Sequence, residues 1–158
     1  MGFIFRNCEY FSNNSLRNLF ISLIRSKLEY CSEIWSPNYN KYIAAIEKIQ
    51  MKFFKFICYK DKREYHRNDY ESELLSFNLQ KLHDRRIIND CILVFKIINK
   101  KFDSNFLLSQ VKHRNHNYNI RKFKILFIEH CNNNTTQYST LNRAFDHFNK
   151  YSYDIDAF

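Results

Sequence analysis

The scarcity of glycine and proline constrains this chain more than any other feature of its sequence. Its 158 residues include one glycine, Gly2, and one proline, Pro37. Tight turns and β-bulges draw heavily on these two residue types, whereas helix interiors exclude both of them. The sequence is therefore poorly suited to a turn-rich β-sandwich or barrel, and it favours long helices.

The composition indicates a packed domain rather than a disordered chain. Hydrophobic residues make up 45% of the sequence and aromatic residues 18%, which is more than a disordered segment carries. A chain of this length buries roughly two-thirds of its unfolded surface when it folds. We therefore predict a mainly α fold, a helical bundle built on an αα-hairpin and a third long core helix.

Helical periodicity locates the hairpin. Apolar residues recur at steps of three and four from Ser15 to Trp35, and Ser15 is placed to cap the N-terminus of that helix. Pro37 ends the helix, and a second apolar seam runs from Tyr42 to about Tyr59. Two such helices with a short connection predict an antiparallel pair.

The stretch YCSEIWSP, residues 30–37, contains the only tryptophan and the only proline of the chain. We expect Trp35 to be buried where the first helix ends, and Pro37 to start the turn into the second. Truncating a buried aromatic side chain to alanine costs about 3–5 kcal/mol. The sequence therefore predicts that Trp35 supports the fold and not a binding site.

The rest of the chain continues the helical pattern and then changes character. The charged stretch 60–72 is an expected exposed loop, and 78–101 is an expected third helix whose second half is apolar nearly all round. Residues 117–131 alternate charge with large apolar side chains, which predicts an extended arm or a short β-hairpin turning at 132–134. A terminal helix with helical spacing from Leu141 to Phe148 follows. We divide the chain into a helical domain, 1–111, and a basic arm with a C-terminal helix, 112–158.

The charge balance favours an acidic partner. The net charge is +9, with 25 Lys and Arg against 16 Asp and Glu, and such an excess suits nucleic acid or an anionic membrane surface. Spacings of seven, four and three residues place four lysines on one stripe of the second helix, away from its apolar seam, where phosphates could lie. A solvated basic face is the alternative. The candidate nucleic-acid-binding residues are this stripe, its continuation into the loop and a second basic run: Lys41, Lys48, Lys52, Lys55, Lys60, Lys62, Arg63, Arg67, Lys112, Arg114, Arg121, Lys122 and Lys124.

The cysteine pattern and the hydropathy of the sequence indicate in which cellular compartment the protein is expected. The five cysteines are widely spaced and lie mostly in apolar runs, where a reduced thiol packs as a small hydrophobic side chain. This pattern suits a reducing intracellular compartment, the nucleus or the cytoplasm. Apolar stretches stay shorter than the roughly 18 residues of a membrane span, and the first residues lack a signal-peptide pattern. We expect neither export nor a membrane partner.

Patterns for metal binding and catalysis are weak. His113, His116, His130 and Cys131 offer nitrogen and sulfur ligands, but their spacing fits no zinc signature, so surface histidines are favoured. A chain with one glycine cannot build a Gly-rich phosphate loop, and its dispersed acids do not form the cluster that holds two Mg²⁺ ions. We expect no catalytic residue, no metal site and no cofactor in this chain.

Charged residues in the third helix allow two interpretations. Arg85 and Arg86 stand four and five residues before Asp90, a spacing at which ion pairs form along a helix surface. The two arginines could instead dock the helix on its neighbour, and this structural interpretation is the favoured one.

Long stretches of the chain resemble a known family. The sequence from GFIFRNCEYF, starting at residue 2, to KFFKFI, ending at residue 57, resembles the segment downstream of the polymerase core in jockey-like non-LTR retrotransposon reverse transcriptases of insect type. Residues 74–103 are similar to the stretch that follows in those proteins, and residues 141–156 to their tail. The recurring positions in the second stretch are Leu82, Arg85, Arg86, Asp90, Phe95 and Lys96.

The resemblance implies a C-terminal piece of an RNA-directed DNA polymerase, comprising the thumb and the region beyond it. The helices of such a thumb grip the template–primer duplex, while Mg²⁺-binding aspartates of the preceding palm carry out nucleotidyl transfer. The aromatic-Ala-Asp-Asp motif of the palm is missing here. The resemblance therefore implies a noncatalytic, thumb-like domain in residues 1–111, with an RNA–DNA or DNA duplex and the polymerase core as partners.

Three alternatives stay open. The chain could be a helical interaction or scaffold module that docks on a polymerase core, a non-functional relic of a retroelement, or, with the least support, an autonomous enzyme. Salt-sensitive binding of nucleic acid that depends on the lysines would support the thumb-like domain. Self-association that persists at high salt would support the scaffold module.

Overall fold

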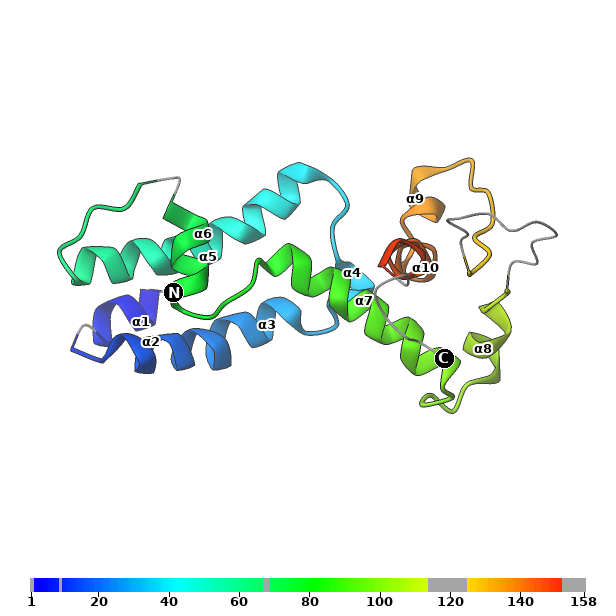
Figure 1. Cartoon of the computed structure of the whole chain (residues 1–158), viewed down its shortest axis with the longest axis horizontal. Coiled ribbons are helices and arrows are strands. Elements are labelled where there is room, and N and C mark those ends of the chain that lie inside the picture. Colours follow the sequence, from blue (N-terminus) through cyan, green and yellow to red (C-terminus); the bar gives the residue numbers. More distant parts are fainter. Residues whose placement is uncertain (1, 9, 67–68, 114–124, 152–158) are drawn as a thin grey trace. The chain divides into compact units, whose positions relative to one another are not determined.

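The computed structural model describes residues 2–8, 10–66, 69–113 and 125–151 (Figure 1). As the sequence predicted, this part of the chain is mainly helical, and its only β-pairing is one antiparallel bridge between His113 and Leu126. Contacts divide the chain into two compact units. Unit 1 comprises Met1–Ser32 and Pro37–Arg85, and unit 2 comprises Glu33–Ser36 and Arg86–Phe158.

Unit 1 contains the predicted αα-hairpin. Its elements are α1 (Gly2–Asn7), α2 (Asn13–Leu19), the π-helical segment η1 (Phe20–Arg25), α3 (Ser26–Glu29), α5 (Asn40–Lys60) and α6 (Tyr70–Ser76). In Figure 1, α5 runs back along α2 and α3, and the rings of Phe20 and Phe53 stack between the two arms with centroids 4.4 Å apart. The buried core of the unit gathers Ile4, Leu16, Phe20, Phe53, Phe54, Ile57, Tyr70, Leu74 and Leu79.

The first arm of the hairpin differs from its prediction at both ends. Ser12, and not Ser15, caps α2: its hydroxyl accepts a hydrogen bond from the Ser15 amide, 3.2 Å away. The helix breaks at Cys31, which has a left-handed φ of 49°, and the single turn α4 (Ser32–Trp35) follows. The expectation that Trp35 is buried was wrong, because 41% of its surface is exposed.

Several helices end in left-handed residues although the chain lacks glycines to supply them. After α5, Lys62 has φ 54°, its amide donates to the Tyr59 carbonyl, and the Arg63 amide donates to the Cys58 carbonyl. This is the Schellman pattern, in which glycine is the usual left-handed residue. Asn78 after α6 and Lys100 after α7 (Leu82–Ile98) repeat it, with φ 47° and 52°.

Helix α6 was not predicted, since the whole stretch 60–72 was expected to be a loop. The loop is shorter, because α6 begins at Tyr70, and Tyr70 and Leu74 are buried against α5. Two acidic residues, Glu71 and Glu73, lie in its first turn, where a negative charge favours the helix dipole. Charged residues are thus typical of the first turn of a helix as well as of a loop, and this explains why the stretch was expected to be a loop.

Unit 2 is organised by α7 and α10 (Thr140–Tyr151), with α8 (Asn105–Gln110) and α9 (Asn134–Gln137) beside them. The predicted terminal helix is confirmed, and its Phe145 and Phe148 are buried. Helix α7 was expected to be buried nearly all round in its second half, but it buries one face. Val94 and Ile97 are inside, whereas Ile92 and Phe95 are each 43% exposed.

The segment before α10 is held by two hydrogen bonds to a side-chain amide. The Leu126 amide donates to Asn149 Oδ1 at 2.8 Å, and Asn149 Nδ2 donates back to the Leu126 carbonyl at 2.9 Å. The predicted turn at 132–134 closes no hairpin among the described residues, since α9 begins at Asn134 and Leu126 pairs with His113 instead. The division into domains 1–111 and 112–158 stays a prediction. Within the described ranges, no helix combines the length and apolar character of a membrane span.

Candidate nucleic-acid interface

The lysine stripe lies on the solvent face of α5. The opposite face of this helix buries Gln50, Phe53, Phe54, Ile57 and Cys58 at helical spacing. Residues three and four apart share one helix face, so Lys48, Lys52 and Lys55 extend together on the other side, where all three are exposed. The amphipathic pattern that packs α5 in unit 1 therefore also presents the cations.

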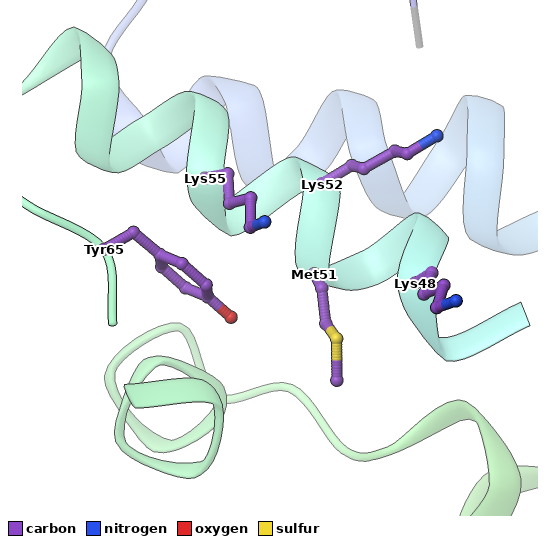
Figure 2. A pocket seen from close by; sticks show the side chains of 5 residues that line it. All are labelled: Lys48, Met51, Lys52, Lys55 and Tyr65. Atoms are coloured by element: carbon purple, nitrogen blue, oxygen red, sulfur yellow. The ribbon is translucent and has the colours of Figure 1, made fainter. Parts of the chain in front are cut away.

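A surface cavity of about 440 Å³ opens beside this stripe (Figure 2). It is lined by Lys48, Met51, Lys52, Lys55 and Tyr65. Figure 2 shows Tyr65 reaching from its loop into the space where Met51 also points, with Lys48 and Lys55 on either side of Met51 and Lys52 extending away from it. The site thus combines an apolar floor with a rim of cations, and no acidic residue is among the five.

The loop that carries Tyr65 is anchored close to the cavity. Arg63 Nη1 lies 3.1 Å from Glu73 Oε1, which ties the loop to α6. The ammonium of Lys55 lies 5.7 Å from the centroid of the Tyr65 ring, within cation–π range. Burial raises the pKa of the Tyr65 phenol, with further contributions from Cys58 and Asp69, so the ring stays neutral at physiological pH and adds no negative charge beside the lysines.

The one acid near the middle of α5 is turned away from the lysines. Glu47 is buried; Tyr70 donates its hydroxyl hydrogen bond to Glu47 Oε2 at 2.5 Å, and the amide of His83 donates to Oε1 at 2.7 Å. His83 lies in the first turn of α7, so this carboxylate caps α7. Burial, together with the hydrogen bond to Glu47, raises the pKa of Tyr70 far above its usual value, which keeps the phenol a donor. The carboxylate is thereby held by the core and not by the lysine stripe.

The three lysines that line the cavity have no acidic partner among the described residues. Among the ion pairs of the described residues, none involves Lys48, Lys52 or Lys55. Lys41 lies on the same helix, exposed near its start, but does not line the cavity.

The other described basic residues of the prediction do not line the cavity. Lys60 donates to Asn13 Oδ1 at 3.0 Å, Lys62 forms the left-handed turn after α5, and Arg63 pairs with Glu73. Lys112 pairs with Glu129 at 2.8 Å in unit 2. The other five predicted positions, Arg67, Arg114, Arg121, Lys122 and Lys124, lie outside the described residues.

Arg85 docks α7 on a neighbouring helix, as the favoured interpretation had it, and Asp90 also pairs with another helix. Arg85 binds Glu29 of α3 with two nitrogens, its Nη2 lying 2.9 Å from Oε2. Asp90 pairs with Arg143 and His147 of α10, more than fifty residues along the chain, and not with a neighbour on its own helix. These residues are explained by packing.

The candidate metal ligands are not brought together in the part of the chain that the structure describes, where no group of three His, Cys, Asp or Glu residues could hold an ion. His113 and His130 are exposed, Cys131 accepts a hydrogen bond from Asn142, and His116 lies outside the described residues.

Sequence reasoning found the lysines, but it missed the cavity and Met51. The signal was present: Met51 stands three residues after Lys48 and four before Lys55, so it lies on the same face. Its side chain is partly buried against the core of unit 1, and only the position of the loop shows that it also faces an opening.

Comparisons with known proteins add no relative. No protein-family model, no curated protein and no solved structure matches this chain.

Proposed function

We propose that this chain is a noncatalytic nucleic-acid-gripping domain that binds an RNA–DNA or DNA duplex through the lysine face of α5. The observation that carries the proposal is that Lys48, Lys52 and Lys55 line one cavity together with Tyr65, and that none of its described lining residues is acidic. Unpaired lysines in such a row contact phosphates irrespective of base sequence. The activity is binding alone, and it needs no cofactor.

The parent protein is part of the same proposal. The resemblance of the sequence to jockey-like retrotransposon reverse transcriptases supports a thumb-like piece of an RNA-directed DNA polymerase, with the polymerase core as second partner and an intracellular site of action, in the nucleus or cytoplasm. In such a parent, Mg²⁺ and the aspartates of the palm would supply the chemistry, and this domain would hold the duplex.

Fluorescence anisotropy with a labelled duplex at several salt concentrations tests the proposal. We expect a Kd of about 10⁻⁴–10⁻⁶ M at physiological salt and a negative slope of log K against log salt, to which each phosphate contact contributes about 0.9. The triple variant K48Q/K52Q/K55Q should bind more weakly and lose about two to three units of slope.

The control variant removes the same charge elsewhere. Lys27, Lys96 and Lys101 are exposed and lie outside the cavity, so K27Q/K96Q/K101Q should keep most of the slope. Equal losses in the two triple variants would remove the assignment to α5 and leave only a diffuse basic surface. Absence of binding to RNA–DNA and DNA duplexes at low salt would remove the function itself.

A second candidate function is a protein-interaction module. The observation that favours it is an apolar stripe on α7, where Ile88, Ile92 and Phe95 follow at helical spacing and are 45%, 43% and 43% exposed. Light scattering at high salt distinguishes it: self-association that persists in salt and is lost in I92E supports the module, whereas a monomer under all conditions argues against self-association through this stripe.

A further inference from the structure

The cavity beside α5 contains more than phosphate binding requires. A surface that follows a phosphate backbone needs cations and polar donors, but here Met51 and the ring of Tyr65 form part of the lining. The volume of about 440 Å³ lies within the range of small-ligand pockets. An aromatic ring beside three unpaired lysines matches the chemistry that binds unpaired nucleotides, in which bases stack on aromatic side chains while cations hold the backbone.

The Tyr65 hydroxyl gives a second, independent indication. Its oxygen is buried and has no hydrogen-bond partner within the described structure, and Figure 2 shows it directed into the space between Lys55 and Met51. A buried polar atom without a partner is unfavourable, so a hydrogen-bonding group that reaches it stabilises the site. The polar edge of a base offers both donors and acceptors to such a group.

We propose that this cavity is a subsite for one unpaired nucleotide, with the base against Tyr65 and Met51 and the flanking phosphates on Lys48 and Lys55. The proposal rests on the proposed function, and it names the part of the nucleic acid that the site recognises. A base inside a duplex is stacked on both faces and paired along its edge, so it cannot enter a cavity of this kind without flipping out. A single-stranded overhang presents such a base at no cost in pairing.

Lys48, Lys55 and the Tyr65 ring lie close enough together to contact one ligand. Lys55 Nζ lies 5.7 Å from the centroid of the Tyr65 ring, so a phosphate bound by Lys55 is adjacent to whatever contacts the ring. Lys48 stands two helical turns before Lys55 along the same face. The two ammonium groups therefore offer places for the phosphates on either side of one nucleotide.

The test compares three labelled probes by fluorescence anisotropy with the full chain. The probes are a blunt duplex, the same duplex with an overhang of adenosines, and the same overhang with abasic sites, which keeps the phosphates and removes the bases. We expect the adenosine overhang to bind about tenfold more tightly than the abasic one, since stacking on an aromatic side chain has an effect of this order.

Variants of Tyr65 assign the preference to the cavity. In Y65L, the preference for adenosine over abasic overhangs should disappear; in Y65F, which retains the ring, most of the preference should remain. Y59L is the matched control, because Tyr59 is 80% exposed and does not line the cavity, and it should behave as wild type. Circular dichroism melting of each variant verifies that it is folded.

The outcomes separate this inference from the proposed function. Equal binding of adenosine and abasic overhangs to the wild-type chain, or a preference that survives in folded Y65L, overturns the nucleotide subsite but leaves salt-sensitive duplex binding intact. Loss of binding to all three probes at low salt overturns both.

Discussion

Replacing Arg143 by methionine tests whether unit 2 depends on one buried ion pair. Arg143 binds Asp90 with two nitrogens, Nε at 3.0 Å from Oδ2 and Nη2 at 3.2 Å from Oδ1, and the two side chains are 7% and 1% exposed. The same guanidinium donates to the backbone carbonyls of Glu33 and Ser36. It therefore joins α7, α10 and the end of α4.

The size of the effect follows from burial. Removing one partner of a buried pair leaves an uncompensated charge and costs about 3–5 kcal/mol, although an apolar replacement of both partners is often neutral. We expect R143M to lower the free energy of unfolding by that amount, and the double variant D90N/R143M to be less destabilised than the two single variants added together. His147, 2.9 Å from Asp90 Oδ2, remains in all of them.

Urea denaturation followed by far-UV circular dichroism measures these differences. Arg85 provides the matched control: it also holds a carboxylate, Glu29, with two nitrogens, but the side chains are 29% and 16% exposed. R85M should therefore cost only about 1 kcal/mol. If R143M costs no more than R85M, the buried pair does not hold unit 2 together and the reasoning fails.

W35A should cost at most about 2 kcal/mol in the same denaturation assay, because the ring is 41% exposed, and a loss of 3–5 kcal/mol would restore the burial expected from sequence. K100G should raise stability by about 0.5–1 kcal/mol, since glycine adopts the φ of 52° without strain, and an unchanged urea midpoint would contradict this. Burial, aided by Asp90, raises the pKa of Cys91 to about 11, whereas an unfolded thiol ionises near 8.5, so stability present below about pH 8.5 should fall as the pH rises towards 11. The fall in urea midpoint between pH 8 and pH 10 should be smaller in C91A, and equal falls would show that Cys91 is not responsible. Y70F should cost about 1–2 kcal/mol by leaving one oxygen of Glu47 without its donor, and a neutral result would mean that water replaces the hydroxyl.

The positions of the principal helices were the most predictable feature of this protein. The second helix was expected to run to about Tyr59 and ends at Lys60, and the terminal helix buries Phe145 and Phe148 as its spacing indicated. These predictions succeeded because α-helical hydrogen bonds are local and the spacing of apolar residues along the sequence shows the helical period. The spacing of the lysines along α5 is equally local, so that stripe was predictable too.

The errors share a different cause. Trp35 and Ile92 were expected inside because they are large and apolar, but each is partly exposed. Whether such a residue is buried depends on which distant segment packs over it, and the periodicity of one helix does not report this. Asp90 shows the same limit, because its partner Arg143 lies fifty-three residues away.

The sequence by itself thus determined that the chain is helical, where its principal helices run and which face of α5 carries the cations. Only the tertiary structure decided that the loop after α5 returns to place Tyr65 beside Lys55. It also decided that YCSEIWSP contains a single helical turn with a partly exposed Trp35, and that Arg143 holds the end of this turn. The physical reason is that helix formation follows contacts within a few residues, whereas cavities and buried ion pairs arise where segments far apart in sequence meet.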